Sequence, residues 1–213
     1  MKLVIRTSSG PYAVGLFDQE DGLLVQKHTE GGGVRQSTLG ELLQECLLEI
    51  DKAMGDLTEI IVDLGPGGLS STRVGVSFAN ALSYGMRLNL LGVSALRMQI
   101  HDVGPNCRTP TLSMRPAPGG QSIWALFDGS DLTASGCGNP DEVIAEYQKL
   151  FGTITVVGPL QRLKLDSKDN RTCILNIDSP SLESMLKSPK IPPQRDGRAF
   201  YLEPINSTDG ASR

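Results

Sequence analysis

The sequence is poor in the side chains that most often build metal sites and catalytic centres. It holds only 2 histidines in 213 residues, His28 and His101, and they form no H-x-x-x-H or H-E-x-x-H pattern. A helix-borne metal site therefore lacks ligands. A serine nucleophile would need a G-x-S-x-G elbow, and none is present. We expect no resident metal, no cofactor and no catalytic nucleophile.

Cysteine is scarce as well, with 4 residues and no C-x-x-C pair. Cys46, Cys107, Cys137 and Cys173 are too dispersed for a zinc or redox motif. An even number of cysteines could pair, but in a reducing compartment we expect four ordinary thiols. The apolar stretch Met1–Arg6 is short and no long apolar run follows it. We therefore expect neither a secretory signal nor a membrane anchor, and a cytoplasmic location.

Charge of one sign is nowhere concentrated. Twenty basic and 24 acidic residues give a net charge of −4, and no two Lys or Arg residues are adjacent. A protein that binds nucleic acid alone needs a concentrated basic face, because phosphate neutralisation supplies most of the non-specific affinity. Autonomous nucleic-acid binding is therefore disfavoured, although basic residues could contribute within a complex.

The 24 glycines and 13 prolines indicate many tight turns, and the chain opens with three strands. We expect these at residues 2–6, 12–17 and 23–28. A helix follows, with the capping-box pair Thr38 and Glu41 at its start and Gly55 at its end. Its apolar face comprises Leu39, Leu42, Leu43, Cys46, Leu47, Ile50, Ala53 and Met54.

Alternating strands and helices come next. We expect a strand at 59–64, a helix from about Ser71 to Gly85, a strand at 89–93 and a helix capped by Ser94. The order β-β-β-α-β-α-β-α is typical of the ribonuclease-H-like domain on which actin-like proteins are built. The predicted fold class is therefore α/β, with an actin-like, ribonuclease-H-like N-terminal lobe at residues 1–102.

The second lobe is expected at residues 103–213. Val103–Gly120 is rich in Pro and Gly and is interpreted as a link between two lobes. About 110 residues that include a polar tail leave too little chain to repeat the first lobe in full, so a reduced α/β lobe is predicted. Its expected elements are strands at 122–127, 153–157 and 173–177 and a helix opened by Asn139 and Pro140.

The glycine-rich run Gly65–Gly68 lies between a predicted strand and helix, where backbone N–H groups could bind an anion. It is neither a Walker A loop nor G-x-G-x-x-G, and a structural turn explains it as well. Actin-like ATP sites place an acid on the first strand, but Arg6 stands there and cannot ligate Mg²⁺. It could pair with an internal acid or contact a phosphate.

The second helix is apolar over more than half of its circumference. Its core face would carry Val74, Phe78, Ala81 and Leu82, with Val76, Ala79 and Met86 extending the apolar character. Such a helix is buried on two sides. Gly75, Ala79 and Ser83 form a ridge of small residues that another helix could approach closely. Either the first helix of this chain or a partner subunit could fill that ridge, and Leu48, on the polar face of the first helix, favours a partner.

Several motifs together resemble one family. They are the runs Gly65–Gly75 (GPGGLSSTRVG), Ser77–Leu82 (SFANAL), Leu91–Leu96 (LGVSAL), Leu3–Ser9 and Ala199–Leu202. The chain is similar in these runs to the TsaB (YeaZ) family, with its G-P-G-S-F-T-G-L-R-[IV]-G, A-x-G-L-A, G-V-S-[TS]-L, I-L-A-[IL]-D-T-S and P-x-Y-L-R patterns. It departs from the family at Arg6, where the pattern has Asp, at Leu69–Ser71, where it has Phe-Thr-Gly, and at 34–37, before the first helix.

The resemblance implies a glycoprotease-like member of the actin-like ATPase superfamily without a catalytic centre. It implies a scaffold that binds the TsaD transferase, with the ATPase TsaE, in the complex that makes N6-threonylcarbamoyladenosine at position 37 of tRNA. Contact with tRNA would be indirect, and the chain alone would form a homodimer through the same helices. The partner surface carried over from the family comprises Gln44, Leu48, Arg73, Gly75, Val76, Ala79, Asn80 and Ser83.

Two other functions stay open. One is a freestanding enzyme, either an actin-like phosphotransferase or a glycopeptidase. The other is a homodimer with no link to tRNA.

Overall fold

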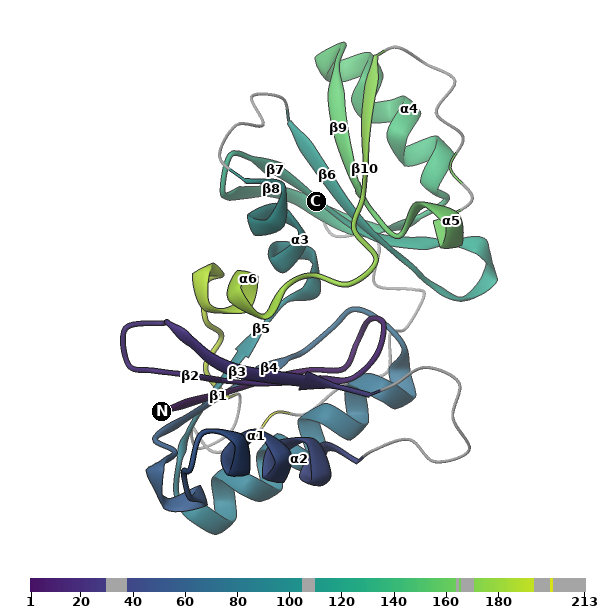
Figure 1. The fold of residues 1–213 in the computed structure, drawn as a ribbon. Helices are drawn as coiled ribbons and strands as arrows, with labels where there is room; N and C mark the ends of the chain where they lie inside the picture. Colours follow the sequence, from purple (N-terminus) through teal and green to yellow (C-terminus); the bar gives the residue numbers. More distant parts are fainter. Residues whose placement is uncertain (30–37, 105–109, 164, 166–170, 194–199, 201–213) are drawn as a thin grey trace. The chain divides into compact units, whose positions relative to one another are not determined.

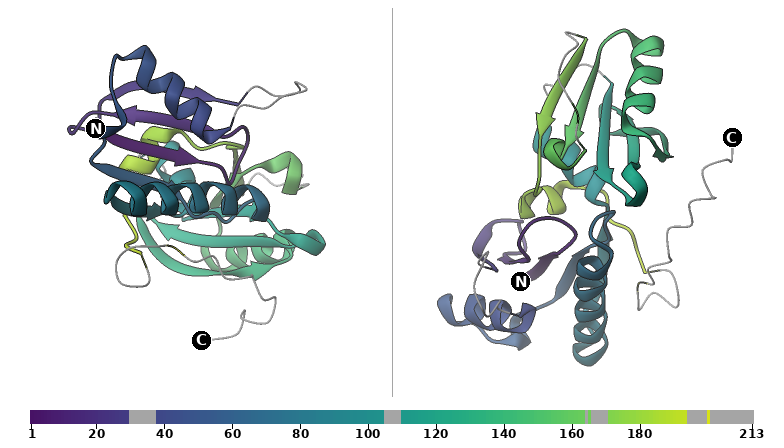
Figure 2. Two further views of the ribbon diagram at one scale, coloured as in Figure 1. Left: turned by 90° about the horizontal axis from the view of Figure 1, so that it is seen from below. Right: turned by 90° about the vertical axis from the view of Figure 1, so that its right-hand side faces the viewer.

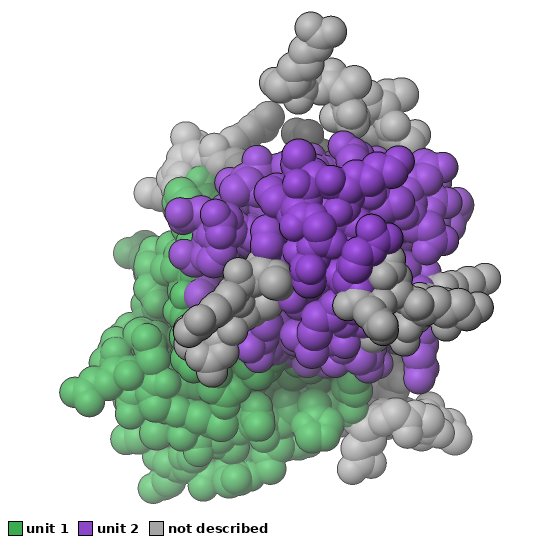
Figure 3. All heavy atoms as spheres, turned by 90° about the horizontal axis from the view of Figure 1, so that it is seen from above, with its two compact units in different colours: residues 1–95, 181–202 green, residues 96–180, 203–213 purple. Residues whose placement is uncertain are grey.

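The computed structural model describes residues 1–29, 38–104, 110–163, 165, 171–193 and 200 (Figure 1). It divides into two compact units, coloured separately in Figure 3. The first unit contains the described residues of Met1–Ala95 and Ser181–Leu202, and the second those of Leu96–Pro180. The sequence predicted the boundary between the lobes at residues 102 and 103, whereas the first unit ends at Ala95 and the second begins at Leu96. The chain returns to the first unit at Ser181.

The first unit is built on a five-stranded sheet of order β3-β2-β1-β4-β5. Strands β1 (Lys2–Arg6), β2 (Ala13–Phe17) and β3 (Leu23–His28) form an antiparallel meander. Strands β4 (Glu59–Asp63) and β5 (Asn89–Val93) continue the sheet parallel to β1. This mixed order, with β1 in the centre, confirms the predicted ribonuclease-H-like lobe.

Helices α1 (Leu39–Glu49) and α2 (Leu69–Met86) lie on one face of this sheet, and α6 (Leu182–Lys187) lies on the other (Figures 1 and 2). The helix α1 packs on β2 and β3, whereas α2 packs on β4, β5 and β1. The core between the sheet and these two helices includes Ile5 of β1, which lies opposite Val14 of β2 and Val62 of β4. Continuous burial of β1, β2 and β4 agrees with a central sheet covered on both faces.

The start of α1 follows the predicted capping box. The Thr38 N–H donates to Glu41 Oε2 at 2.7 Å, and the Glu41 N–H donates to Thr38 Oγ1 at 3.2 Å. The helix ends earlier than predicted, at Glu49, because Asp51 adopts a left-handed φ of 52°. A short 3₁₀ turn, Met54–Asp56, replaces the expected last turns.

The second unit contains another five-stranded sheet, of order β10-β9-β6-β7-β8. Strands β6 (Thr111–Pro116), β7 (Ser122–Asp128) and β8 (Asp131–Gly138) form an antiparallel meander. Strands β9 (Ile154–Gly158) and β10 (Thr172–Asn176) extend it in parallel from β6. The connectivity is that of the first sheet, so the predicted reduction of the second lobe does not affect its sheet.

The strand β6 lies inside the segment that we interpreted as a link, and it was missed because it carries polar residues at buried positions. The Ser113 hydroxyl contacts Leu96 O at 2.9 Å and Gln99 Oε1 at 2.7 Å. Arg115 donates from Nη1 to Asp178 O at 3.2 Å. Buried polar groups are tolerated when they have such hydrogen-bond partners. The hydrophobic periodicity of the sequence cannot predict that these polar residues are buried.

The reduction of the second lobe concerns its helices. The helix α4 (Pro140–Phe151) starts at Asn139, whose side chain accepts the N–H groups of Asp141 and Glu142, as the sequence predicted. In contrast, α5 (Leu160–Leu163) is a single turn, and α3 (Ala95–Val103) joins the two units. A 3₁₀ turn, Pro118–Gly120, precedes β7. In the part of the chain that the structure describes, no helix is both long and apolar enough to cross a bilayer.

Candidate partner-binding helices and glycine-rich loop

The outer face of α1 agrees with the prediction for its two site residues. Gln44 is exposed, and Leu48 has 72% of its surface accessible. The opposite face, including Leu42, Cys46 and Leu47, is buried in the core. Leu48 is therefore a large apolar side chain that the described part of its own unit leaves uncovered.

The small-residue ridge of α2 faces inward. Gly75, Val76, Ala79 and Ser83 are all buried, and Val76 and Ala79 belong to the core beneath the helix. A Cβ atom at Gly75 would lie 2.3 Å from Thr7 Oγ1, at the end of β1. The ridge thus brings α2 close to the sheet of its own chain. These four residues are buried within their own unit and are therefore not accessible for docking.

The predicted core face of α2 was right for Phe78 and Leu82 and wrong for Val74 and Ala81. Val74 is 46% exposed and Ala81 is exposed, whereas Phe78 and Leu82 are half-buried against the core. Small residues face the sheet because they permit close packing, and larger apolar residues turn outward. Tyr84, 80% exposed, was missed. Its spacing of two turns from Ser77 places it on the face that carries Arg73, which is also exposed.

Asn80 is engaged within the chain. Its Nδ2 donates to Phe200 O at 2.9 Å, and its Oδ1 accepts the Phe200 N–H at 3.0 Å. Its amide is thus satisfied by the backbone of a residue 120 positions away. Of the eight predicted partner-binding residues, Gln44, Leu48 and Arg73 are exposed.

The glycine-rich loop is closed onto the end of β1. Asp63, fully buried, accepts the N–H of Ser8 at 2.9 Å and that of Gly65 at 2.8 Å. The Gly68 N–H donates to Ser8 O at 3.2 Å, and a Cβ at Gly67 would lie 2.1 Å from that oxygen. Two N–H groups of the loop, those of Gly65 and Gly68, are therefore used internally, which favours the structural-turn interpretation.

The last residue of β1 and the residues that follow it complete this region. Arg6, 8% exposed, donates from Nη2 to Pro11 O at 3.4 Å. The Thr7 and Ser9 hydroxyls are buried, and within the described residues neither has a hydrogen-bond partner. Two buried hydroxyl groups beside a glycine-rich loop could donate hydrogen bonds to an anion.

The scattered histidines and cysteines stay apart. Among the described residues, no three His, Cys, Asp or Glu side chains lie close enough to hold a metal ion. Cys46 is buried, and burial raises its pKa to about 11. It is therefore a neutral core thiol that donates to Val14 O at 3.8 Å. Cys137 and Cys173 are free and exposed, and Cys107 lies outside the described residues.

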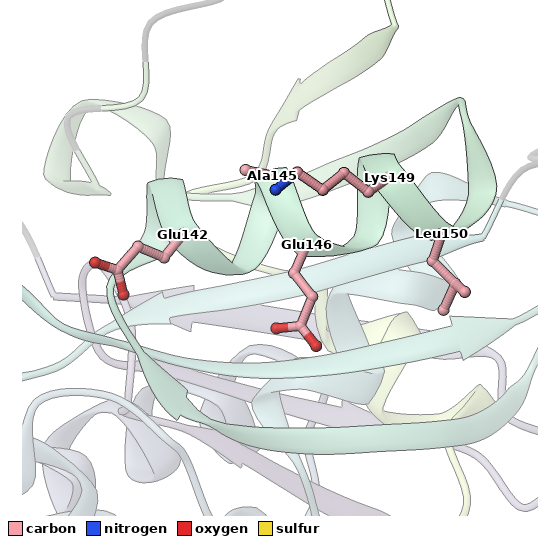
Figure 4. A pocket seen from close by; sticks show the side chains of 5 residues that line it. All are labelled: Glu142, Ala145, Glu146, Lys149 and Leu150. Carbon is pink, nitrogen blue, oxygen red and sulfur yellow. The ribbon is translucent and has the colours of Figure 1, made fainter.

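A pocket in the second unit lies on α4 (Figure 4). In Figure 4, Glu142, Glu146 and Leu150 project from the same side of the helix. Ala145 and Lys149 complete the described lining. Two carboxylates at helical spacing on an outer face are typical of a solvated helix, and all of the described lining residues come from this one helix.

Comparisons with known proteins relate the chain to one group. Residues 24–126 match the sequence profile of the family described as "TsaD: tRNA N6-adenosine threonylcarbamoyltransferase". Two curated proteins of that name are similar. The protein of Chromobacterium violaceum is 28% identical over 179 residues, covering 74% of this chain and 52% of that protein. That of Desulfitobacterium hafniense is 32% identical over 116 residues, covering 49% of this chain and 34% of that protein. The chain thus spans about half or less of these relatives.

Solved structures define the fold. YeaZ from Pseudomonas aeruginosa superposes with a TM-score of 0.67, covering 87% of this chain and 88% of that chain at 14% identity. A protein described as similar to peptidase YeaZ from the same species gives a TM-score of 0.69 with the same coverage at 15% identity. The chain is therefore an α/β protein of two units. Its fold is that of YeaZ, as the sequence resemblance predicted.

Proposed function

We propose that this chain is a non-catalytic subunit that binds a TsaD-like transferase in the machinery that makes N6-threonylcarbamoyladenosine in tRNA. The YeaZ fold over nearly the whole chain and the TsaD-type match over residues 24–126 support a role in this modification. The observation that carries the docking role is the set of exposed apolar side chains on helices α1 and α2, which lie on the same face of the first sheet (Figure 1). A TsaE-like ATPase would join the same assembly, and tRNA would be contacted through the complex.

The proposed docking surface comprises Gln44 and Leu48 of α1 and Arg73, Val74 and Tyr84 of α2. It differs from the surface expected from the sequence, because it leaves out the buried residues of the α2 ridge. In their place it includes Val74 and Tyr84, which are exposed on the same helix. Leu48 and Tyr84 are among the most exposed large apolar residues. Full burial of a leucine contributes about 1.5–3 kcal/mol, so Leu48 alone could supply a substantial part of a partner contact.

The test is co-purification with the TsaD-like transferase of the same organism. Leu48→Glu should leave the fold intact, because the side chain lies in solvent, and should weaken the complex strongly. Burying an unpaired carboxylate costs several kcal/mol, and each 1.4 kcal/mol is tenfold in affinity, so we expect a loss of roughly a hundredfold or more. Ala79→Glu would not serve, because Ala79 is fully buried and the change would unfold the chain.

A matched control is Leu150→Glu. Leu150 is 68% exposed on α4, so the same chemical change is made at a similar exposure in the other unit. The complex should tolerate it. Equal retention of the complex by both variants, or equal loss, would count against docking through α1 and α2. Size-exclusion chromatography of the isolated Leu48→Glu chain tests the homodimer, which should dissociate if it uses the same helices.

A second candidate is a freestanding actin-like phosphotransferase, which the buried hydroxyls of Thr7 and Ser9 favour. They lie in the segment onto which the glycine-rich loop packs, and a phosphate could accept from both. Against it stands Asp63, which holds the adjacent N–H groups. Calorimetric titration of the isolated chain with ATP and Mg²⁺ separates the two candidates. Micromolar affinity would favour the enzyme, and no binding would favour the subunit.

A further inference from the structure

The two helices of the proposed docking surface differ in the sign of their charge. The helix α1 has three acidic residues, Glu41, Glu45 and Glu49, and no Lys or Arg. The helix α2 has no Asp or Glu, and its charged residue is Arg73, with Arg87 as its C-terminal cap. Both helices lie on the same face of the first sheet (Figures 1 and 2). This helical layer is therefore negative over α1 and positive over α2.

Two of these charges are available to a partner. Glu45 and Arg73 are both exposed. Among the residues that the structure describes, Lys27 of β3 forms its ion pair with Glu49, whereas Glu45 and Arg73 form none. Glu45 lies three residues before Leu48, at the spacing of neighbours on a helix surface. An unpaired carboxylate thus borders the exposed leucine of α1, and an unpaired guanidinium lies on the outer face of α2.

We propose that the partner presents the opposite arrangement, with carboxylates facing α2 and Lys or Arg side chains facing α1. This inference rests on the proposed function, in which a TsaD-like transferase docks on these two helices. Apolar contacts alone are not directional, so they do not distinguish the correct orientation of a partner from one rotated by half a turn. Complementary charges across an interface disfavour the wrong orientation and fix the register. The charges of α1 and α2 therefore select the orientation in which the transferase binds.

A ligand with charge of one sign fits only half of this surface. Nucleic acid would be attracted to Arg73 through its phosphates and repelled by the carboxylates of α1, including Glu45. A strongly basic segment would meet the reverse situation on α2. A folded protein surface can present both signs at fixed positions, which agrees with a protein partner and with contact to tRNA only through the complex.

The test measures the association rate constant and the Kd of the complex with the TsaD-like transferase by surface plasmon resonance. Arg73→Glu should lower the association rate constant about tenfold or more at low ionic strength, and the loss should shrink in 0.5 M NaCl on the order of the screening by salt. The matched control is Arg162→Glu, at an exposed position of α5 in the second unit, which changes the net charge equally. It should change the rate constant less than about twofold. Arg73→Gln, which removes the charge without reversing it, should fall between wild type and Arg73→Glu.

A charge swap separates the local arrangement from the net charge. The double variant Glu45→Lys with Arg73→Glu keeps the net charge of the chain at −4. It should bind more weakly than either single variant, because both contacts with the transferase become repulsive. Binding of the swapped chain at the wild-type rate and affinity would show that only the net charge matters and would overturn the proposal.

Leu48→Glu distinguishes a failure of this proposal from a failure of the proposed function. If Leu48→Glu weakens the complex while Arg73→Glu binds as well as Arg162→Glu, docking on these helices stands and the charge arrangement is wrong. If Leu48→Glu and the charge variants all bind like wild type, docking on α1 and α2 is itself wrong. Circular dichroism confirms that each variant is folded, and Arg73→Gln carries the test if the reversed charge unfolds the chain.

Discussion

Replacing Gly75 by alanine tests whether the small-residue ridge of α2 packs on the sheet of its own chain. A Cβ at this position would lie 2.3 Å from Thr7 Oγ1, 3.0 Å from its Cγ2 and 3.2 Å from its Cβ. Thr7 is 1% exposed, so its side chain has little room to yield. Forcing an extra methyl group into such a site costs about 1–3 kcal/mol.

Gly85, in the last turn of the same helix, provides the matched control, because a Cβ there would meet nothing within 4 Å. Alanine stabilises an exposed helix position relative to glycine by about 0.5–1 kcal/mol. Both substitutions gain this helix-propensity contribution in similar measure. The difference between the two variants therefore approximates the packing cost at Gly75, about 1–3 kcal/mol.

The assay is urea unfolding followed by circular dichroism, with the free energy of unfolding compared among wild type, Gly75→Ala and Gly85→Ala. We expect Gly85→Ala to unfold at higher urea than wild type and Gly75→Ala at lower urea than Gly85→Ala. Adding Thr7→Ala to Gly75→Ala should recover part of the loss, because it removes the two closest atoms. If both alanine variants are stabilised equally, the ridge does not face the sheet and the orientation described here for α2 is wrong.

Two further predictions concern buried groups. The pKa of Cys46, raised by burial to about 11 from the ordinary 9.0, means that the neutral thiol contributes stability that is complete below about pH 9 and lost as pH rises through 11. Between pH 7.5 and pH 10, the free energy of unfolding of the wild type should therefore fall by about 1.4 kcal/mol more than that of Cys46→Ala. If the two free energies of unfolding change with pH in parallel, this prediction is wrong. Asp63→Asn keeps one acceptor oxygen where two N–H groups now bind the carboxylate, so it should destabilise the chain by about 1–3 kcal/mol in urea unfolding. An unchanged midpoint would show that Asp63 does not hold the loop closed.

Elements whose signals are local were predictable from the sequence. The start of α1 follows from Thr38 and Glu41, whose reciprocal hydrogen bonds need only a single turn of helix. Asn139 marks the start of α4 for the same reason. The buried strands β4 and β5 were evident as short apolar runs between turn residues. The order of these elements was sufficient to predict the ribonuclease-H-like first lobe.

Tertiary structure decided what no short window contains. The apolar residues of α2 surround the helix, so periodicity could not say whether Val74 or Val76 faces the core, and the approach of Gly75 to Thr7 settled it. The strand β6 is concealed by a buried serine and a buried arginine whose hydrogen-bond partners lie in other elements. Asn80 was assigned to a partner surface by resemblance to the family, and no local pattern shows that it binds the backbone of Phe200, 120 positions away. Local hydrogen bonds and hydrophobic periodicity are encoded over a few residues, whereas close packing and long-range hydrogen bonds depend on segments that only folding brings together.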